Sequence, residues 1–125
     1  MAFSSVEEGV QMSAVITLKS RFDFDNVYQN GRSCANRLLI MYIIPNGMSV
    51  DRYGLVVSKK VGNSVIRHRA RRLMKESARL TGRIGEKGYD IILVARPGIR
   101  DKKMAEVDEA FHHLLTIMRH RKPGR

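Results

Sequence analysis

The chain has few residues that could cross-link it through disulfides or a metal ion, or insert it into a membrane. It contains one cysteine and no tryptophan in 125 residues. Cys34 alone excludes an internal disulfide, and no Cys/His spacing typical of zinc is present. No apolar run approaches the ~18 residues of a membrane span. The N-terminus carries Glu7 and Glu8 and lacks the basic and apolar regions of a secretory signal. The sequence therefore predicts a protein of the reducing cytoplasm with no membrane partner.

Acidic residues are also few. The chain has 12 Asp and Glu against 23 Lys and Arg, a formal net charge of +11. This excess predicts a polyanionic partner, although charge alone does not separate a nucleic acid from an acidic membrane surface. The length fits one domain, and 43% hydrophobic residues can build a core. We predict a disordered, acidic extension over 1–12, a folded domain over 13–118 and a basic tail over 119–125.

Apolar periodicity predicts the helices and strands. Ser20 and Asp23 have the spacing of a helix capping box, and Phe24, Val27 and Tyr28 then fall on one helical face. The predicted elements are a helix over 21–30, strands over 38–44 and 53–58, a helix over 63–80, a strand over 89–96 and a helix over 101–118. This order suits a single-domain α+β fold, an α-β sandwich.

The strand over 38–44 is apolar on both faces. Period two places Leu38, Ile40, Tyr42 and Ile44 on one face, and the residues between them on the other. Both faces must therefore be covered, one by protein and the other by protein or a ligand. The turn signal at 45–47, Pro-Asn-Gly, predicts a hairpin between this strand and the next.

The segment 58–79 concentrates the positive charge. It holds eight Lys or Arg and one acid, Glu76. At about 100° per residue, Ile66, Ala70, Leu73, Ser77 and Leu80 form one stripe, and the cations occupy the opposite arc with Arg69 at its boundary. Like charges four residues apart repel by a few tenths of a kcal/mol. A helix face exposed only to solvent would carry both positive and negative side chains, so this arc favours a nucleic-acid contact.

The sequence favours RNA over DNA as the nucleic acid. It has none of the spacings of helix-turn-helix, zinc-finger or leucine-zipper proteins. A helix does not easily enter the deep, narrow major groove of an RNA duplex. The cationic helix would instead meet phosphates and non-helical junctions of a folded RNA.

Several stretches of the chain resemble a known family. The stretch SKKVGNSVIRHRARRLMKE at 58–76 looks like the signature of the bacterial ribonuclease P protein subunit. The helix pattern F-x-x-V-[FY]-x-x-G is matched by Phe24, Val27, Tyr28 and Gly31. The run Ala-Asn-Arg at 35–37 and YDIILVARPG at 89–98 also match. The resemblance covers about residues 18–118.

The resemblance implies a function and a topology. In this family the protein binds a large catalytic RNA, and together they remove the 5′ leader of precursor tRNA. Mg²⁺ held mainly by the RNA does the chemistry, so the protein alone is expected to be inactive. No obligate protein partner is predicted. The resemblance also implies a short extra strand over 32–35, giving the order α-β-β-β-α-β-α, and a left-handed β-α-β crossover. General statistics would predict a right-handed one.

Two sets of residues are carried over from the family. The catalytic RNA is expected to contact Lys59, Lys60, Asn63, Arg67, His68, Arg69, Arg71, Arg72 and Lys75. A cleft for the precursor-tRNA leader is expected from Phe24, Tyr28, Ile40 and Tyr42. Pattern alone would make Phe24 and Tyr28 core residues. His68 departs from the family, because the motif has Asn there, and it lacks the paired donor and acceptor of an amide.

Other chemistries have weaker support. No DxD on a strand, HExxH or paired-carboxylate spacing predicts a metal site or a catalytic residue on the protein. Asp23 and Asp25 point to different sides of a helix. The alternatives are a generic basic RNA-binding module, such as a ribosomal protein, and an autonomous metal nuclease.

Overall fold

The structure is a computed structural model that describes residues 15–81 and 88–120, without the side chains of the last two. The extension predicted over 1–12 lies outside the described residues, as does 121–125 of the predicted basic tail over 119–125. The two remaining tail residues belong to the last helix.

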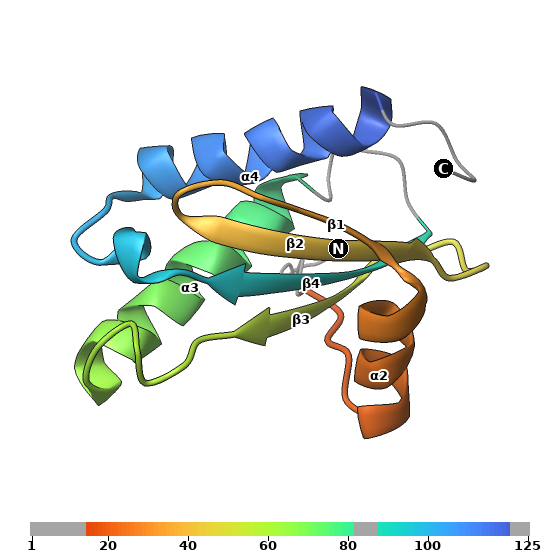
Figure 1. Cartoon of the computed structure of the whole chain (residues 1–125), viewed down its shortest axis with the longest axis horizontal. Coiled ribbons are helices and arrows are strands. Elements are labelled where there is room, and N and C mark those ends of the chain that lie inside the picture. The colour runs from red at the N-terminus through yellow and green to blue at the C-terminus, as the bar shows by residue number, and fades with distance from the viewer. Residues whose placement is uncertain (1–14, 82–87, 121–125) are drawn as a thin grey trace, which may run out of the picture.

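Three helices and four strands follow the predicted order (Figure 1). In chain order they are α2 (Arg21–Asn30), β1 (Arg32–Ala35), β2 (Leu39–Pro45), β3 (Arg52–Val56), α3 (Ser64–Thr81), β4 (Tyr89–Ala95), the 3₁₀ turn η1 (Pro97–Ile99) and α4 (Met104–His120). The mixed α+β class and the order α-β-β-β-α-β-α are therefore confirmed. The strand implied by the resemblance is β1.

Side chains cap the helices where the sequence predicts. The Ser20 hydroxyl accepts a 3.0 Å hydrogen bond from the Asp23 amide and begins α2. The Asn63 side chain accepts one of 3.0 Å from the Ile66 amide and begins α3. The last helix begins three residues later than predicted, because η1 and Asp101, at φ 63°, interrupt the helical backbone before it.

The sheet has the strand order β1-β2-β4-β3. β2 is antiparallel to β1 and β4, whereas β3 is parallel to β4. The predicted hairpin between the strands over 38–44 and 53–58 is therefore wrong, because β4 lies between them. The turn carries the chain across the start of β4, where the Asn46 amide donates 2.8 Å to the carbonyl of Gly88.

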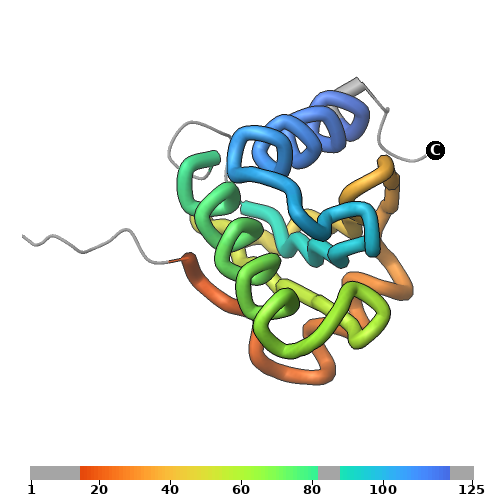
Figure 2. Tube along the Cα trace, turned by 90° about the vertical axis from the view of Figure 1, so that its left-hand side faces the viewer, coloured from red at the N-terminus to blue at the C-terminus, as the bar shows by residue number. Residues whose placement is uncertain are grey.

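The connection from β3 through α3 to β4 is left-handed, as the resemblance implied. Both strands run toward the left of Figure 1, β4 lies above β3, and α3 lies behind them. Figure 2, viewed along the strands, also places α3 on the side of the sheet that faces away from the viewer in Figure 1. This hand is rare, since almost all such crossovers are right-handed.

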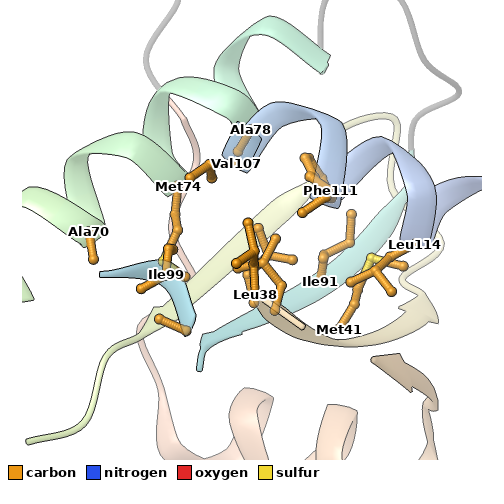
Figure 3. Close-up of a cluster of buried hydrophobic side chains, with 14 of the residues drawn as sticks. Leu38, Met41, Ala70, Met74, Ala78, Ile91, Ile99, Val107, Phe111 and Leu114 are labelled. Atoms are coloured by element: carbon orange, nitrogen blue, oxygen red, sulfur yellow. The ribbon is translucent and has the colours of Figure 1, made fainter. Parts of the chain in front are cut away.

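The core lies mainly between the sheet and the pair α3 and α4 (Figure 3). Leu39, Met41 and Ile43 of β2 point into it with Met74 and Phe111 from the helices. The alternate residues of β2 face α2, where a smaller cluster surrounds Leu18, Val27 and Ile92. The predicted division of β2 into two faces is confirmed except for Leu38. This residue precedes β2 and belongs to the larger core.

Candidate nucleic-acid interface

The predicted RNA-contacting residues lie on α3 and on the loop that leads into it. We call them the cationic surface: Lys59, Lys60, Asn63, Arg67, His68, Arg69, Arg71, Arg72 and Lys75. All are exposed except Arg67, which is half-buried and donates 3.2 Å from Nε to the carbonyl of Gly62. Asn63 serves as the helix cap. These two residues therefore also position the segment.

The buried side of α3 differs in phase from the prediction. The residues that the helix buries are Ala70, Met74, Ser77, Ala78 and Thr81. Leu80, predicted in the stripe, is 38% exposed. The reason is that α3 packs against α4 as well as the sheet, and Ala78 lies beside α4 (Figure 3). Ser77 is also fully buried, and its hydroxyl is satisfied by a 2.6 Å hydrogen bond that it donates to Asp108 of α4.

Only the far end of the cationic arc is neutralised within the described residues. Arg79 forms an ion pair with Glu76 one turn away, and Nε contributes a hydrogen bond of 3.0 Å. This hydrogen bond lowers the pKa of the Glu76 carboxyl. In the described part of the chain, no carboxylate lies at ion-pair distance from the cations of the cationic surface. They are therefore available to an anionic partner.

The residues predicted to receive the leader lie on the opposite face of the sheet. We call Phe24, Tyr28, Ile40 and Tyr42 the aromatic surface. The rings of Tyr28 and Tyr42 meet edge to face with centroids 4.8 Å apart, and Phe24 lies 6.5 Å from Tyr28. Ile40 shares the face of β2 with Tyr42. Tyr28 is 41% exposed and the other three are half-buried, so the patch is neither core nor fully open.

Local packing explains how these rings are held. A Cβ added to Gly54 of β3 would lie 2.6 Å from the Phe24 ring, so only glycine lets the ring rest on the strand. Burial, followed by the neighbouring Tyr42, raises the pKa of the Tyr28 phenol. A tyrosine phenol is already neutral near pH 7 at its ordinary pKa of about 10, and this shift moves it further from ionisation, so its ring can stack on a base without adding a repelling charge.

An ion cluster fixes α2 against the sheet beside the aromatic surface. Arg52 donates to both oxygens of the buried Asp90 carboxylate at 2.8 and 2.7 Å. Another nitrogen of the same guanidinium lies 3.5 Å from Asp23 of α2. The hydrogen bond to Asp90 raises the pKa of Arg52. Sequence reasoning missed this cluster, because its three members are far apart in the chain.

Two other neighbours of the aromatic surface, Val56 and Val94, were also missed. They face α2 on the same side of the sheet as Ile44, which the period-two pattern had placed on the face of Tyr42. The period-two pattern of the strand over 89–96 could have indicated Val94, whereas Val56 needed the strand order.

Within the described ranges, no helix is long and apolar enough to cross a bilayer. No three His, Cys, Asp or Glu side chains are grouped there to hold a metal ion.

The fold and surfaces together are those of a small α+β protein with a cationic helix on one side of its sheet and clustered aromatic rings on the other, an arrangement typical of the nucleic-acid-binding class. Comparison with known proteins gives the family. The family model for Ribonuclease P matches residues 12–119. The chain therefore belongs to the ribonuclease P protein family, as a bacterial-type protein component.

Individual relatives agree with this assignment. The ribonuclease P protein component of Lachnoclostridium phytofermentans is 50% identical over 101 residues, covering 81% of this chain and 87% of the relative. The solved RNase P protein of Staphylococcus aureus is 30% identical with a TM-score of 0.75, covering 83% of this chain and 95% of that one. The protein from Thermotoga maritima is 25% identical with a TM-score of 0.72, covering 85% and 97%.

Proposed function

We propose that this chain binds the catalytic RNA of ribonuclease P through the cationic surface and the 5′ leader of precursor tRNA through the aromatic surface. The holoenzyme then removes the leader. Its RNA holds the Mg²⁺ that supplies the chemistry, and the protein supplies binding and positioning. Because precursor tRNA is the substrate, the proposal locates the chain in the cytoplasm.

The unneutralised arc of α3 is the observation that carries the RNA-binding part. Arg71, Arg72 and Lys75 are exposed on one helix with no carboxylate at ion-pair distance among the described residues. Such an arrangement costs stability unless an anion lies against it. The planar guanidinium of arginine matches a phosphate with two parallel hydrogen bonds.

The arrangement of rings supports the leader-binding part. A single-stranded leader exposes base faces, and stacking on an aromatic ring is worth about 1–3 kcal/mol per base. Tyr28 offers a partly exposed ring, and Tyr42 braces it edge to face. A plain core would bury these rings completely.

Reconstitution tests the proposal directly. Precursor tRNA is incubated with protein alone, with a bacterial ribonuclease P RNA alone and with both, at low and high Mg²⁺. We expect cleavage at low Mg²⁺ only when both are present, because the cations of the protein reduce the repulsion between the two RNAs. Cleavage by protein alone would indicate an autonomous nuclease. RNA binding without any gain in cleavage would indicate a generic RNA-binding module.

A further inference from the structure

A cavity lies between α3 and the connection from β4 to α4, apart from the aromatic surface. Its volume is about 280 Å³. It is lined by Ile66, Arg69, Ala70, Ile99, Arg100, Asp101 and Lys103. Of these, the proposed function uses only Arg69.

The floor of this cavity is apolar. Ala70 of α3 and Ile99 of η1, both labelled in Figure 3, are 3% and 1% exposed. Ile66 completes the floor and is half-buried. A planar, weakly polar group can rest on such a floor, because its faces need no hydrogen bonds. The volume lies just below the ~300 Å³ at which sites for drug-sized ligands begin, so a group of limited size fits.

The rim of the cavity is cationic. Arg69, Arg100 and Lys103 are all exposed there, and the one acid on the rim is Asp101. Within the described residues, none of the three cations lies at ion-pair distance from a carboxylate. The rim therefore carries a net positive charge that is not used inside the protein, and Asp101 adds a hydrogen-bond acceptor beside it.

We propose that the cavity receives one unstacked nucleotide of the RNA that binds the cationic surface. The base packs against Ile66, the most accessible of the apolar lining residues, and lies above Ala70 and Ile99, while the phosphate lies against Arg69, Arg100 and Lys103. Asp101 accepts a hydrogen bond from an exocyclic amino group of the base, as carboxylates do from cytosine. Proteins commonly read folded RNA through splayed bases of this kind. This inference rests on the proposed function, because the catalytic RNA is the source of the nucleotide.

Methyl groups in the floor allow a direct test on the full, free chain. Cytidine 5′-monophosphate is titrated into methyl-labelled protein, with inorganic phosphate as the parallel probe. We expect saturable shifts of the Ile66 and Ile99 methyl resonances with the nucleotide, because its aromatic base contacts Ile66 and lies close above Ile99. Inorganic phosphate should leave them in place. The Ile40 and Ile44 methyls, on the other side of the sheet, report separately on the aromatic surface.

Two adjacent lysines provide matched variants. Lys103 lines the cavity and Lys102 does not, although both substitutions remove one charge. Lys103→Ala should weaken nucleotide binding several-fold and Lys102→Ala should change it less than two-fold. Floor methyls that never shift, that shift equally with phosphate, or that respond equally in both variants would overturn the proposal.

Competition shows whether the RNA is the source of the nucleotide. Millimolar cytidine 5′-monophosphate should weaken binding of the catalytic RNA to the unsubstituted protein more than the same concentration of phosphate does. The difference should vanish in Lys103→Ala. Nucleotide binding without such competition would contradict the assignment to RNA. Cleavage by the reconstituted holoenzyme is read separately, so a failed cavity and a failed function are distinguishable.

Discussion

Gly54 shows how one missing side chain shapes the aromatic surface. A Cβ at this position would lie 2.6 Å from two carbons of the Phe24 ring and 3.4 Å from Ile92. The ring of Phe24 therefore occupies the space that a side chain on β3 would take. Phe24 is thus partly a packing residue, whereas the more exposed Tyr28 is the better candidate for stacking on RNA.

Gly54→Ala should destabilise the protein by about 1–3 kcal/mol, the usual cost of overpacking, because the Phe24 ring must move. The measurement is a double-mutant cycle, in which chemical denaturation gives the free energies of unfolding of Gly54→Ala, Phe24→Ala and the double variant. In the double variant the clash is gone, so its loss should be at least about 0.5 kcal/mol smaller than the sum of the single losses. Additive losses would mean that the two residues do not compete for the same space.

On the scale of elements, α3 combines two roles in one helix. It covers the core with Met74 and Ala78 and presents Arg71 and Lys75 to the outside. Arg79 continues the same row of cations but is already paired with Glu76. The row therefore divides into cations available to RNA and one that is neutralised within the helix.

Arg71→Ala should reduce the salt dependence of binding to the catalytic RNA more than Arg79→Ala does. Each lost phosphate contact lowers the slope of log affinity against log salt by about 0.7–0.9. We expect a change of that size for Arg71→Ala and a smaller one for Arg79→Ala, measured by filter binding between roughly 50 and 200 mM salt. Equal changes in the two variants would place the RNA elsewhere or show that the ion pair opens on binding.

The control variant also has a stability effect with a defined pH dependence. Because the folded-state pKa of Glu76 lies below its ordinary value, the ion pair stabilises the protein above pH 4.5 and this contribution is lost as the pH falls through the lowered pKa. Both partners are partly exposed, so the contribution is at most about 1 kcal/mol. Because Arg79→Ala loses no more than this amount of stability, we expect it to be folded near pH 7, where its RNA binding is compared with that of Arg71→Ala.

The helices and caps were predictable because their signals are local. Ser20 and Asn63 act on amides three residues away. The strand partners were not predictable in the same way, because Pro45, Asn46 and Gly47 specify a turn but not which strand lies beside β2. The phase of α3 also depended on α4, whose contact buries Ala78 beyond the apolar stripe. For the site, the motif at 58–76 indicated the cationic surface, whereas Arg100 and Lys103 reach the cavity only through the fold.

On the scale of the whole molecule, the sheet separates two surfaces. The cationic surface belongs to the side of α3 and α4, and the aromatic surface to the side of α2 (Figures 1 and 2). The left-handed crossover brings α3 to the side opposite α2. A large RNA can therefore lie against one side while a single strand lies against the other.

One measurement tests this separation most directly. It is the affinity of the reconstituted holoenzyme for precursor tRNA and for mature tRNA, compared between Tyr28→Ala and Arg71→Ala. Tyr28→Ala should still assemble with the catalytic RNA and should lose affinity for precursor tRNA alone, by about 1–3 kcal/mol for one stacked base. Arg71→Ala should weaken assembly of the protein with the catalytic RNA. Once enough protein is added to saturate that RNA, the preference for precursor over mature tRNA should be unchanged. Equal losses for the two tRNAs in Tyr28→Ala, together with a large drop in melting temperature, would show that the aromatic surface is core and contradict the account.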